Sequence, residues 1–376
     1  MRRRGYRRLV PALLRRTLYP DAFGFGDLRA RGIRAQHDLT LPPERVETPL
    51  APELGIWPEA HFAATPRYEL PPVHAARLRG AYYAPWFNLI TDRRGAVLRD
   101  SASTVLPIDH RALSKRLPRR PLELPGHCAL FRSVHNSFYH TLIDNLARAS
   151  LLRAPCYRAL AEIKLLVPGP PTAHEQFLFD RCLPGNLVVT QVPDDRQILP
   201  EILIFASFPT RRSVSCLPTA CRSDMLRHLL PGRPRRPRHR ILIERRPGPR
   251  KCARVIENHG ALADALAPFG FISYRLEELG FEEQIALFYD AEAVVAAHGA
   301  GLANLVFSRN VDVLELHPSR MVMPHFYFLS TCMGHRYHYW KGSQRHFDDS
   351  FAVDVDGVLQ RLPARLRRPA RRGACG

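Results

Sequence analysis

The chain has 376 residues, with 55 lysines and arginines against 35 acidic residues and a formal net charge of +20. Its hydrophobic content of 45% excludes an intrinsically disordered protein, and its length allows two domains of ordinary size. The charge excess lies in residues 1–20, 233–254 and 361–376, whereas the rest of the chain holds 32 basic and 34 acidic residues. This nearly neutral body argues against a specific nucleic-acid-binding protein, although the basic segments would attract nucleic acid or an anionic membrane surface without specificity.

The first 75 residues are rich in proline and arginine and weakly periodic, so we predict an irregular lead-in with a basic amphipathic first helix. Residues 76–230 alternate between short apolar runs and helical patterns, which predicts an N-terminal domain with a parallel sheet covered by helices. The runs expected to form its strands are 129–131, 163–167, 187–189 and 202–205.

Residues 231–237 contain three prolines and one glycine and are predicted to be a linker, because such a segment continues neither a helix nor a central strand. The alternation then restarts and predicts a second domain over residues 238–345, followed by a basic tail over 346–376. The expected fold class is α/β, with two Rossmann-like domains and a ligand-binding cleft between them.

The eight cysteines lack the spacing of a disulfide module, which indicates a reducing compartment. The apolar stretch 9–14 is short and contains Pro11, so it does not fit a signal peptide. No uninterrupted apolar run of about 18 residues predicts a membrane span. We expect a cytoplasmic protein, with a peripheral contact to the inner membrane through its basic termini.

One helical pattern carries Asn136, His140 and Asp144 at a spacing of four residues, which places them on one helical face. A carboxylate one turn from a histidine can fix its tautomer and raise its basicity, so His140 is our candidate general base. A surface or capping cluster is the alternative.

Basic residues follow the strand expected at 241–243. Arg245 and Arg246 lie in the loop after it and Arg254 at the start of the next helix, where their charges can neutralise a diphosphate. The alternative is a solvated basic loop.

The apolar run 293–297 leads into the turn His298, Gly299, Ala300 and Gly301. Its small residues leave backbone N–H groups accessible, and such a turn between a strand and a helix suits an anionic or phosphorylated ligand. A tight connection that binds nothing is the alternative.

Other chemistries have weaker signals. Cys332, His335 and His338 could be imagined around zinc, but no second pair has finger-like spacing. The sequence contains no Gly-x-Ser-x-Gly nucleophile elbow, no Walker A motif, and no RNP or zinc-finger signature.

Taken in order, the motifs resemble glycosyltransferase family 61, whose members transfer a sugar from a nucleotide donor to a protein or polysaccharide acceptor. The resemblance covers roughly residues 125–340, and its ordered series is far more specific than any one motif. It rests on Asn136/His140/Asp144, Arg245-Arg246, Arg254 with Asn258, Glu283-Gln284-Ile285, the stretch from His298 to Asn304, residues 313–318, and Phe326 with Tyr337.

The resemblance implies an inverting, GT-B-like bacterial enzyme that moves a sugar from a nucleotide-sugar, a UDP-sugar, to a polysaccharide or glycoconjugate hydroxyl. It implies that Asn136, His140 and Asp144 are catalytic and that no metal or other cofactor is required. We expect His298 to donate to a phosphate or to hold the turn, and Glu315 to reach the ribose hydroxyls. The implied donor-binding residues are Arg245, Arg246, Arg254, Asn258, His298, Gly299, Ala300, Gly301, Asn304 and Glu315.

One position departs from the family pattern. The family has an acid after the asparagine of its Arg-x-x-x-Asn motif, and here His259 occupies that place. The alternative to an enzyme is therefore a catalytically inactive nucleotide- or sugar-binding protein on the same scaffold. A nonspecific nucleic-acid binder is the third hypothesis.

Overall fold

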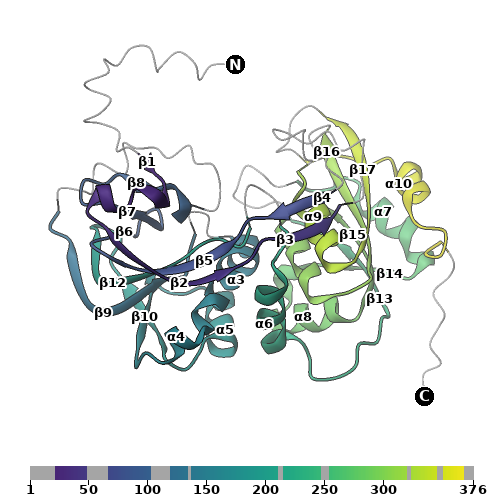
Figure 1. Ribbon diagram of the computed structural model, residues 1–376. Coiled ribbons are helices and arrows are strands. Elements are labelled where there is room, and N and C mark those ends of the chain that lie inside the picture. Colours follow the sequence, from purple (N-terminus) through teal and green to yellow (C-terminus); the bar gives the residue numbers. More distant parts are fainter. Residues whose placement is uncertain are drawn as a thin grey trace, which may run out of the picture. The chain divides into compact units, whose positions relative to one another are not determined.

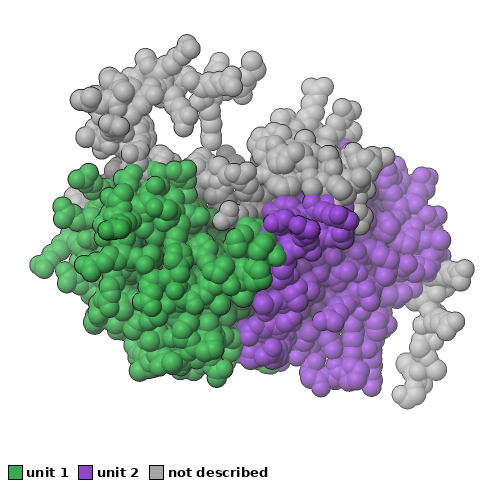
Figure 2. All heavy atoms as spheres, viewed as in Figure 1, with its two compact units in different colours: residues 1–43, 71–212 green, residues 44–70, 213–376 purple. Residues whose placement is uncertain are grey.

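The chain forms two compact units (Figures 1 and 2). Unit 1 comprises residues 1–43 and 71–212, and unit 2 comprises residues 44–70 and 213–376. None of the helices in the described ranges has the length and hydropathy that a membrane span needs. The computed structural model describes residues 22–48, 67–102, 119–133, 137–210, 215–246, 254–319, 323–344 and 350–367.

Unit 1 is built on a mixed sheet, to which the described residues contribute ten strands. Four parallel strands lie in the order β12-β9-β10-β11. They contain the four predicted runs except for Phe131, so the predicted parallel sheet is confirmed here. These strands are β9 (Leu122–Leu130), β10 (Ile163–Pro168), β11 (Leu187–Val192) and β12 (Ile198–Ala206).

The far side of β12 carries an extension that sequence periodicity did not predict. There, β12 pairs antiparallel with β5 and β6, and β5 pairs with β2. The extension consists of β1 (Ala22–Phe23), β2 (Arg34–Leu41), β5 (Val73–Arg79), β6 (Tyr82–Ala84), β7 (Leu89–Thr91) and β8 (Val97–Leu98).

The helical segments of unit 1 connect the parallel strands: a π-helical turn (His140–Asn145), α3 (Leu146–Ala149), α4 (Pro155–Arg158) and α5 (Ala173–Cys182). Arg148 in α3 fixes this region to the end of β9. Its buried guanidinium donates to the carbonyl oxygens of Leu130 and Phe131 at 2.9 and 2.7 Å and lies over the ring of Phe208. The π-helical turn is thereby held at the carboxyl edge of the parallel strands.

Unit 2 contains a five-stranded sheet whose neighbouring strands are all parallel. In chain order its arrangement is 2-1-3-4-5, that of a doubly wound sheet. The chain leaves β13 toward β14 and leaves β15 toward β16, so the switch point lies between β13 and β15. The strands, in sheet order, are β14 (Phe271–Tyr274), β13 (His239–Ile243), β15 (Ala291–Ala297), β16 (Asp312–Ser319) and β17 (Arg336–Gln344).

Helices cover both faces of this sheet (Figure 1). On one face, α7 (His259–Leu266) and α10 (Val355–Arg361) pack against Leu242, Val295 and Leu314. A 3₁₀ helix (Ala300–Phe307) contacts α8 and α9. The remaining elements of unit 2 are α6 (Thr219–Leu229), α8 (Phe281–Tyr289), α9 (His325–Met333) and the paired strands β3 (Glu44–Glu47) and β4 (Arg67–Leu70).

The predicted irregular lead-in over residues 1–75 does not describe the fold. β2 lies within it, and Phe23, Leu28 and Ile33 are buried in the core of unit 1. The few apolar side chains of this segment stand among charged ones, so its sequence shows no strand-like alternation. The strand β2 is stabilised by its hydrogen bonds to β5. The predicted basic helix near the N-terminus lies outside the described residues.

The predicted linker over residues 231–237 belongs to unit 2, whereas the chain passes between the units near residue 212. The buried carboxylate of Asp290 accepts hydrogen bonds from Arg233 and from the backbone N–H of Arg236, both at 2.8 Å. Arg235 donates to three backbone carbonyl groups. Prolines prevent regular structure here, but the arginines still bind the segment to the unit.

The prediction of a basic tail over residues 346–376 is also wrong for residues 350–367, the part that the structure describes. Phe351, Val353, Val358 and Leu362 are buried in the core of unit 2. Val358 and Leu362 have the i, i+4 spacing of a packed helix, which could have identified α10. The neighbouring arginines concealed this short apolar pattern.

Candidate functional site

The turn after β15 is shaped by an arginine from a neighbouring loop. Gly299 has an extended backbone with a φ of 173°, so it is not required for an unusual conformation. Its small size matters for space, because a Cβ atom there would lie 1.6 Å from Nη1 of Arg245 and would force that guanidinium to move. That nitrogen donates to the carbonyl oxygen of His298 at 3.1 Å. The structure therefore brings Arg245 and the glycine turn together at the switch point between β13 and β15.

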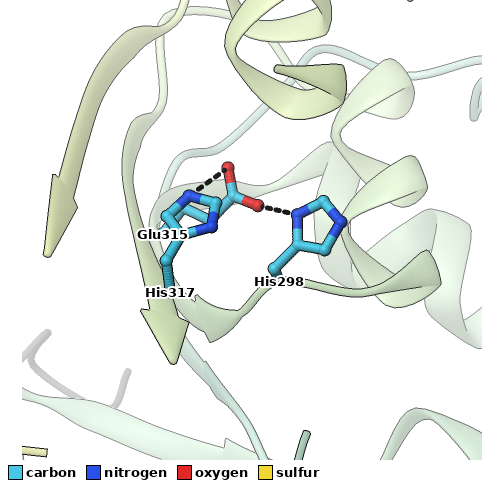
Figure 3. Close-up of side chains that lie close together, drawn as sticks. All are labelled: His298, Glu315 and His317. Atoms are coloured by element: carbon cyan, nitrogen blue, oxygen red, sulfur yellow. Dashed lines mark hydrogen bonds and ion pairs between the residues drawn. The ribbon is translucent and has the colours of Figure 1, made fainter. Parts of the chain in front are cut away.

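Glu315 gathers three side chains below the turn, and Figure 3 shows its two histidine partners. His298 Nδ1 lies 2.5 Å from Oε1 of Glu315, and the Tyr337 hydroxyl donates to Oε2 at 2.5 Å. His317 Nε2 lies 3.5 Å from the same Oε2. Alternate residues of a strand share a face, which is why Glu315 and His317 of β16 point the same way. The carboxylate is fully buried and is held from β16, β17 and the turn.

Burial and charge set the protonation of this cluster. Burial lowers the pKa of His298 to about 4, although the carboxylate of Glu315 opposes the shift. Burial raises the pKa of Glu315, but the two histidines outweigh it and hold that pKa well below its ordinary value. At neutral pH, Glu315 is ionised and His298 is neutral. The Nδ1–H group of His298 donates to the carboxylate, so its Nε2 carries the lone pair.

The side chains of a metal site also come together here. Among the described residues, one group of potential ligands has all its ligand atoms within 4.8 Å of one another, and it consists of His298, Glu315 and His317. The separation of 2.5 Å between His298 Nδ1 and Glu315 Oε1 is that of a direct hydrogen bond. Tyr337 occupies the other carboxylate oxygen. This geometry fits a hydrogen-bonded cluster, because an ion would have to separate these pairs before it could bind.

Arg254 is the second predicted arginine that contributes to this region. Its backbone has a φ of 45°, an uncommon left-handed conformation for a residue with a side chain. Its positive charge helps to lower the pKa of His298. A strained residue that adds charge beside a candidate anion site is a functional signal that the sequence does not contain.

Two other predicted donor-binding residues have partners within the protein. Arg246 forms an exposed ion pair with Glu278 at 2.9 Å. The side-chain amide of Asn258 donates to the carbonyl oxygen of Val353 at 2.8 Å and accepts its N–H at 2.9 Å. Asn258 thereby ties the start of α7 to the segment that precedes α10.

Asn304 stabilises the turn from behind. Its Nδ2 group donates to the carbonyl oxygen of Gly301 and to Oε1 of Gln284, both at 3.1 Å. Gln284 in turn donates to the carbonyl oxygen of Leu276 at 2.8 Å. Sequence reasoning assigned no role to Gln284, although a polar residue on the buried face of a helix was an available signal.

A second histidine–carboxylate pair lies in unit 1. His140 Nδ1 is 2.6 Å from Oδ2 of Asp144, and the hydroxyl of Thr210 donates to Oδ1. The aspartate is buried, whereas 17% of the His140 side-chain surface is exposed to solvent. The predicted partner Asn136 lies outside the described residues.

The His140–Asp144 pair sits on a π-helical turn rather than on the predicted α-helix. The N–H group of Leu146 donates to the carbonyl oxygen of Thr141, five residues earlier. Such turns are rare and occur frequently at functional sites. Periodicity predicted the pairing of the two side chains but not the turn that carries it.

The residue that departs from the family pattern, His259, begins α7. Its Nε2 lies 3.1 Å from the Ser273 hydroxyl, and burial lowers its pKa, although Glu244 opposes the shift. An acid at this position would carry a negative charge, whereas His259 is neutral at neutral pH.

The zinc hypothesis gains no support. His335 donates through Nε2 to the carbonyl oxygen of Leu305 at 3.0 Å and accepts the N–H of Val311 at 3.3 Å. Within the described ranges, Cys332, His335 and His338 do not form a group of converging ligands.

Residues 138–314 match a family model described as Glycosyltransferase 61. The matched range contains His140, Asp144, Arg245 and His298, and it ends one residue before Glu315. A comparison with curated proteins gave no match.

Proposed function

Because the chain belongs to glycosyltransferase family 61, we propose that it transfers a sugar from a nucleotide-sugar, a UDP-sugar, to a hydroxyl group of a polysaccharide or glycoconjugate. The observation that supports this most strongly is the turn at the switch point of unit 2. There, Arg245 lies against Gly299 and next to the buried pair of His298 and Glu315. Ligands of doubly wound sheets bind at this edge.

The donor diphosphate binds between Arg245, Arg254 and the backbone N–H groups of the turn. Both arginines carry a charge that does not depend on pH, and the N–H groups at the start of the 3₁₀ helix add partial positive charge. These groups stabilise the diphosphate as it departs, a contribution of about 2.7 to 4 kcal/mol for one well-placed donor. No metal is needed for this step in the proposal.

His298 and Glu315 have roles that differ from those we expected. The neutral tautomer of His298 carries a lone pair on Nε2, so it accepts a hydrogen bond from a donor hydroxyl and does not donate to a phosphate. Both oxygens of Glu315 have partners in the protein. Glu315 therefore acts through His298, which it orients, rather than by reaching the ribose.

His140 is the proposed general base. Asp144 holds its Nδ1–H group, so Nε2 takes the proton of the acceptor hydroxyl. The acceptor oxygen then forms a bond to the anomeric carbon while the bond to the diphosphate oxygen breaks, and the configuration inverts. The proposal assigns the donor to unit 2 and the acceptor base to unit 1, as in a GT-B enzyme.

The test combines binding with turnover. A site-specific ligand raises apparent stability, so a panel of nucleotides should give a shift in Tm with UDP that is lost in Arg245→Ala. Transfer or donor hydrolysis should follow for one of the UDP-sugars. Binding without any turnover would favour the inactive binding protein suggested by His259, and no nucleotide binding would contradict both the transferase and a nucleotide-binding protein.

The proposed membrane contact is separate from this chemistry. It rests on the seven arginines of residues 1–20, which lie outside the described residues. Co-sedimentation with anionic liposomes should be lost when these residues are deleted.

A further inference from the structure

Two cysteines of unit 2 meet at the ends of different elements. The sulfur of Cys332, near the end of α9, accepts the N–H of Leu217 at 3.4 Å and lies 3.5 Å from the carbonyl oxygen of the same residue. Cys216, the residue before Leu217, donates through its thiol to the carbonyl oxygen of Phe328 at 3.3 Å. Phe328 lies one helical turn before Cys332, so the two contacts bring the thiols close to each other.

The surroundings make the two thiols unequal. The Arg222 guanidinium of α6 lies 3.1 Å from the sulfur of Cys332. The neighbouring Cys216 thiol and this charge lower the pKa of Cys332 below its ordinary value, although burial opposes the shift. The neighbouring Cys332 sulfur, together with burial, raises the pKa of Cys216 well above its ordinary value. A half-buried thiol that ionises more readily than usual therefore lies beside a buried thiol that ionises less readily, the arrangement of an attacking and a resolving cysteine.

We propose that Cys216 and Cys332 form a reversible redox pair, in which a hydroperoxide oxidises Cys332 and Cys216 then closes a disulfide between the segment before α6 and the end of α9. The Cys332 thiolate attacks the terminal oxygen of the peroxide. The S–O bond forms as the O–O bond breaks, and the alkoxide leaves as an alcohol after taking a proton. The sulfur loses two electrons to the peroxide.

The second step consumes the sulfenic acid. The sulfur of Cys216 attacks the sulfur of Cys332, the S–S bond forms as the S–O bond breaks, and the hydroxide leaves as water with the proton of the Cys216 thiol. A dithiol reductant returns both thiols. The arginine that favours the thiolate also keeps the reactive sulfur in place, because it donates to the backbone carbonyl of Cys332.

The pair is linked to the candidate donor site through α9. His325 and Phe326 at the start of this helix pack against His298, with ring centroids 5.8 and 5.3 Å apart. The next residue, Tyr327, packs edge-on against Tyr337, whose hydroxyl holds Glu315. A disulfide at the end of α9 therefore restrains the helix that contacts the histidine. This consequence rests on the proposed function, whereas the disulfide does not.

The first experiment treats the full-length protein with hydrogen peroxide and maps its disulfides by mass spectrometry. We expect the loss of two thiols, one linked peptide pair containing Cys216 and Cys332, and complete recovery with dithiothreitol. Persistence of both thiols, or a linkage that joins either one to a different cysteine, would overturn the proposal. This test uses the unaltered chain, so it does not depend on whether a variant folds.

The second experiment separates the two roles. In Cys216→Ala, the sulfenic acid of Cys332 should accumulate and react with dimedone, whereas Cys332→Ser should give no adduct and no disulfide. Cys128→Ala is the matched control, because burial raises the pKa of Cys128 to about 11 and its loss should leave the disulfide unchanged. A dimedone adduct on Cys216 would reverse the assignment and contradict the proposal.

A third measurement tests the link to the site. The affinity for UDP should change several-fold between the reduced and the oxidised protein, and not in Cys332→Ser. If the disulfide forms and the affinity for UDP does not change, the link between the disulfide and the donor site is contradicted, whereas the redox pair itself is not. No UDP binding in either state would count against the proposed function and leave the redox pair standing.

Discussion

Both units contain a histidine whose Nδ1 is held by a carboxylate, at 2.6 Å in the His140–Asp144 pair and at 2.5 Å in the His298–Glu315 pair. The surroundings differ. His140 keeps partial exposure on a helical turn, and its aspartate has one further hydroxyl partner. His298 is buried, and its glutamate is held from two strands. This difference supports the proposed proton transfer by the pair in unit 1 and the proposed ligand recognition by the pair in unit 2.

The largest effect should come from the His140–Asp144 pair. His140→Gln and Asp144→Asn should lower kcat by about 10²- to 10⁴-fold, because a positioned general base contributes that much, while the Kd for UDP stays the same. Steady-state kinetics and calorimetry measure the two quantities. An unchanged kcat in both variants would remove the general-base role from unit 1.

The next effect concerns donor binding in unit 2. Gly299→Ala should weaken UDP binding by about 10- to 100-fold, because the new Cβ would displace Arg245 and a charge-assisted hydrogen bond is lost. Gly260→Ala in α7 is the control, since a Cβ there meets nothing within 4 Å. Equal UDP affinities for the two variants would show that the turn does not bind the donor.

Acid should destabilise unit 2 through its buried neutral histidines. The pKa of His335 is lowered by burial to about 4 from an ordinary 6.5. Between these values the unfolded chain binds more protons than the folded one, so stability falls as the pH falls from 6.5 to 4. The loss from this residue is about 2 kcal/mol at pH 5.

His335→Gln tests this acid effect. Its decrease in Tm between about pH 7.5 and about pH 5 should be smaller than that of the wild-type protein. Thermal unfolding at the two pH values measures the difference. Parallel pH profiles for the two proteins would contradict the assignment.

The smallest effect should come from Tyr337→Phe, which removes one hydrogen bond from the buried Glu315 carboxylate. We expect a loss of about 1 to 2 kcal/mol in the free energy of unfolding, together with a modest loss of UDP affinity. Denaturant unfolding measures the first quantity. If Asp144→Asn lowered the free energy of unfolding by the same amount as Tyr337→Phe and left kcat unchanged, both histidine–carboxylate pairs would have only a structural role.

Sequence reasoning worked where a pattern is local or strongly periodic. It located the four parallel strands of unit 1, the strands β13 and β15 of unit 2, the pairing of His140 with Asp144, and the turn after β15. It did not predict the contacts that Thr210, Tyr337 and Gln284 make, although the last two stand in the motifs of the resemblance. These residues are distant in sequence from the groups they support and become their neighbours only when strands and helices pack. Element boundaries failed for a related reason, since β2 and α10 depend on partners far along the chain.

The π-helical turn has a consequence for insertions and deletions. It is equivalent to an α-helix that has gained one residue, and the extra residue is accommodated by a hydrogen bond that spans five positions instead of four. Removing a single residue between Thr141 and Asn145 would let the segment relax to an ordinary α-helix. The side chains that follow would then change their angular position relative to His140, so the spacing of this short segment, and not only its composition, determines which carboxylate the imidazole meets.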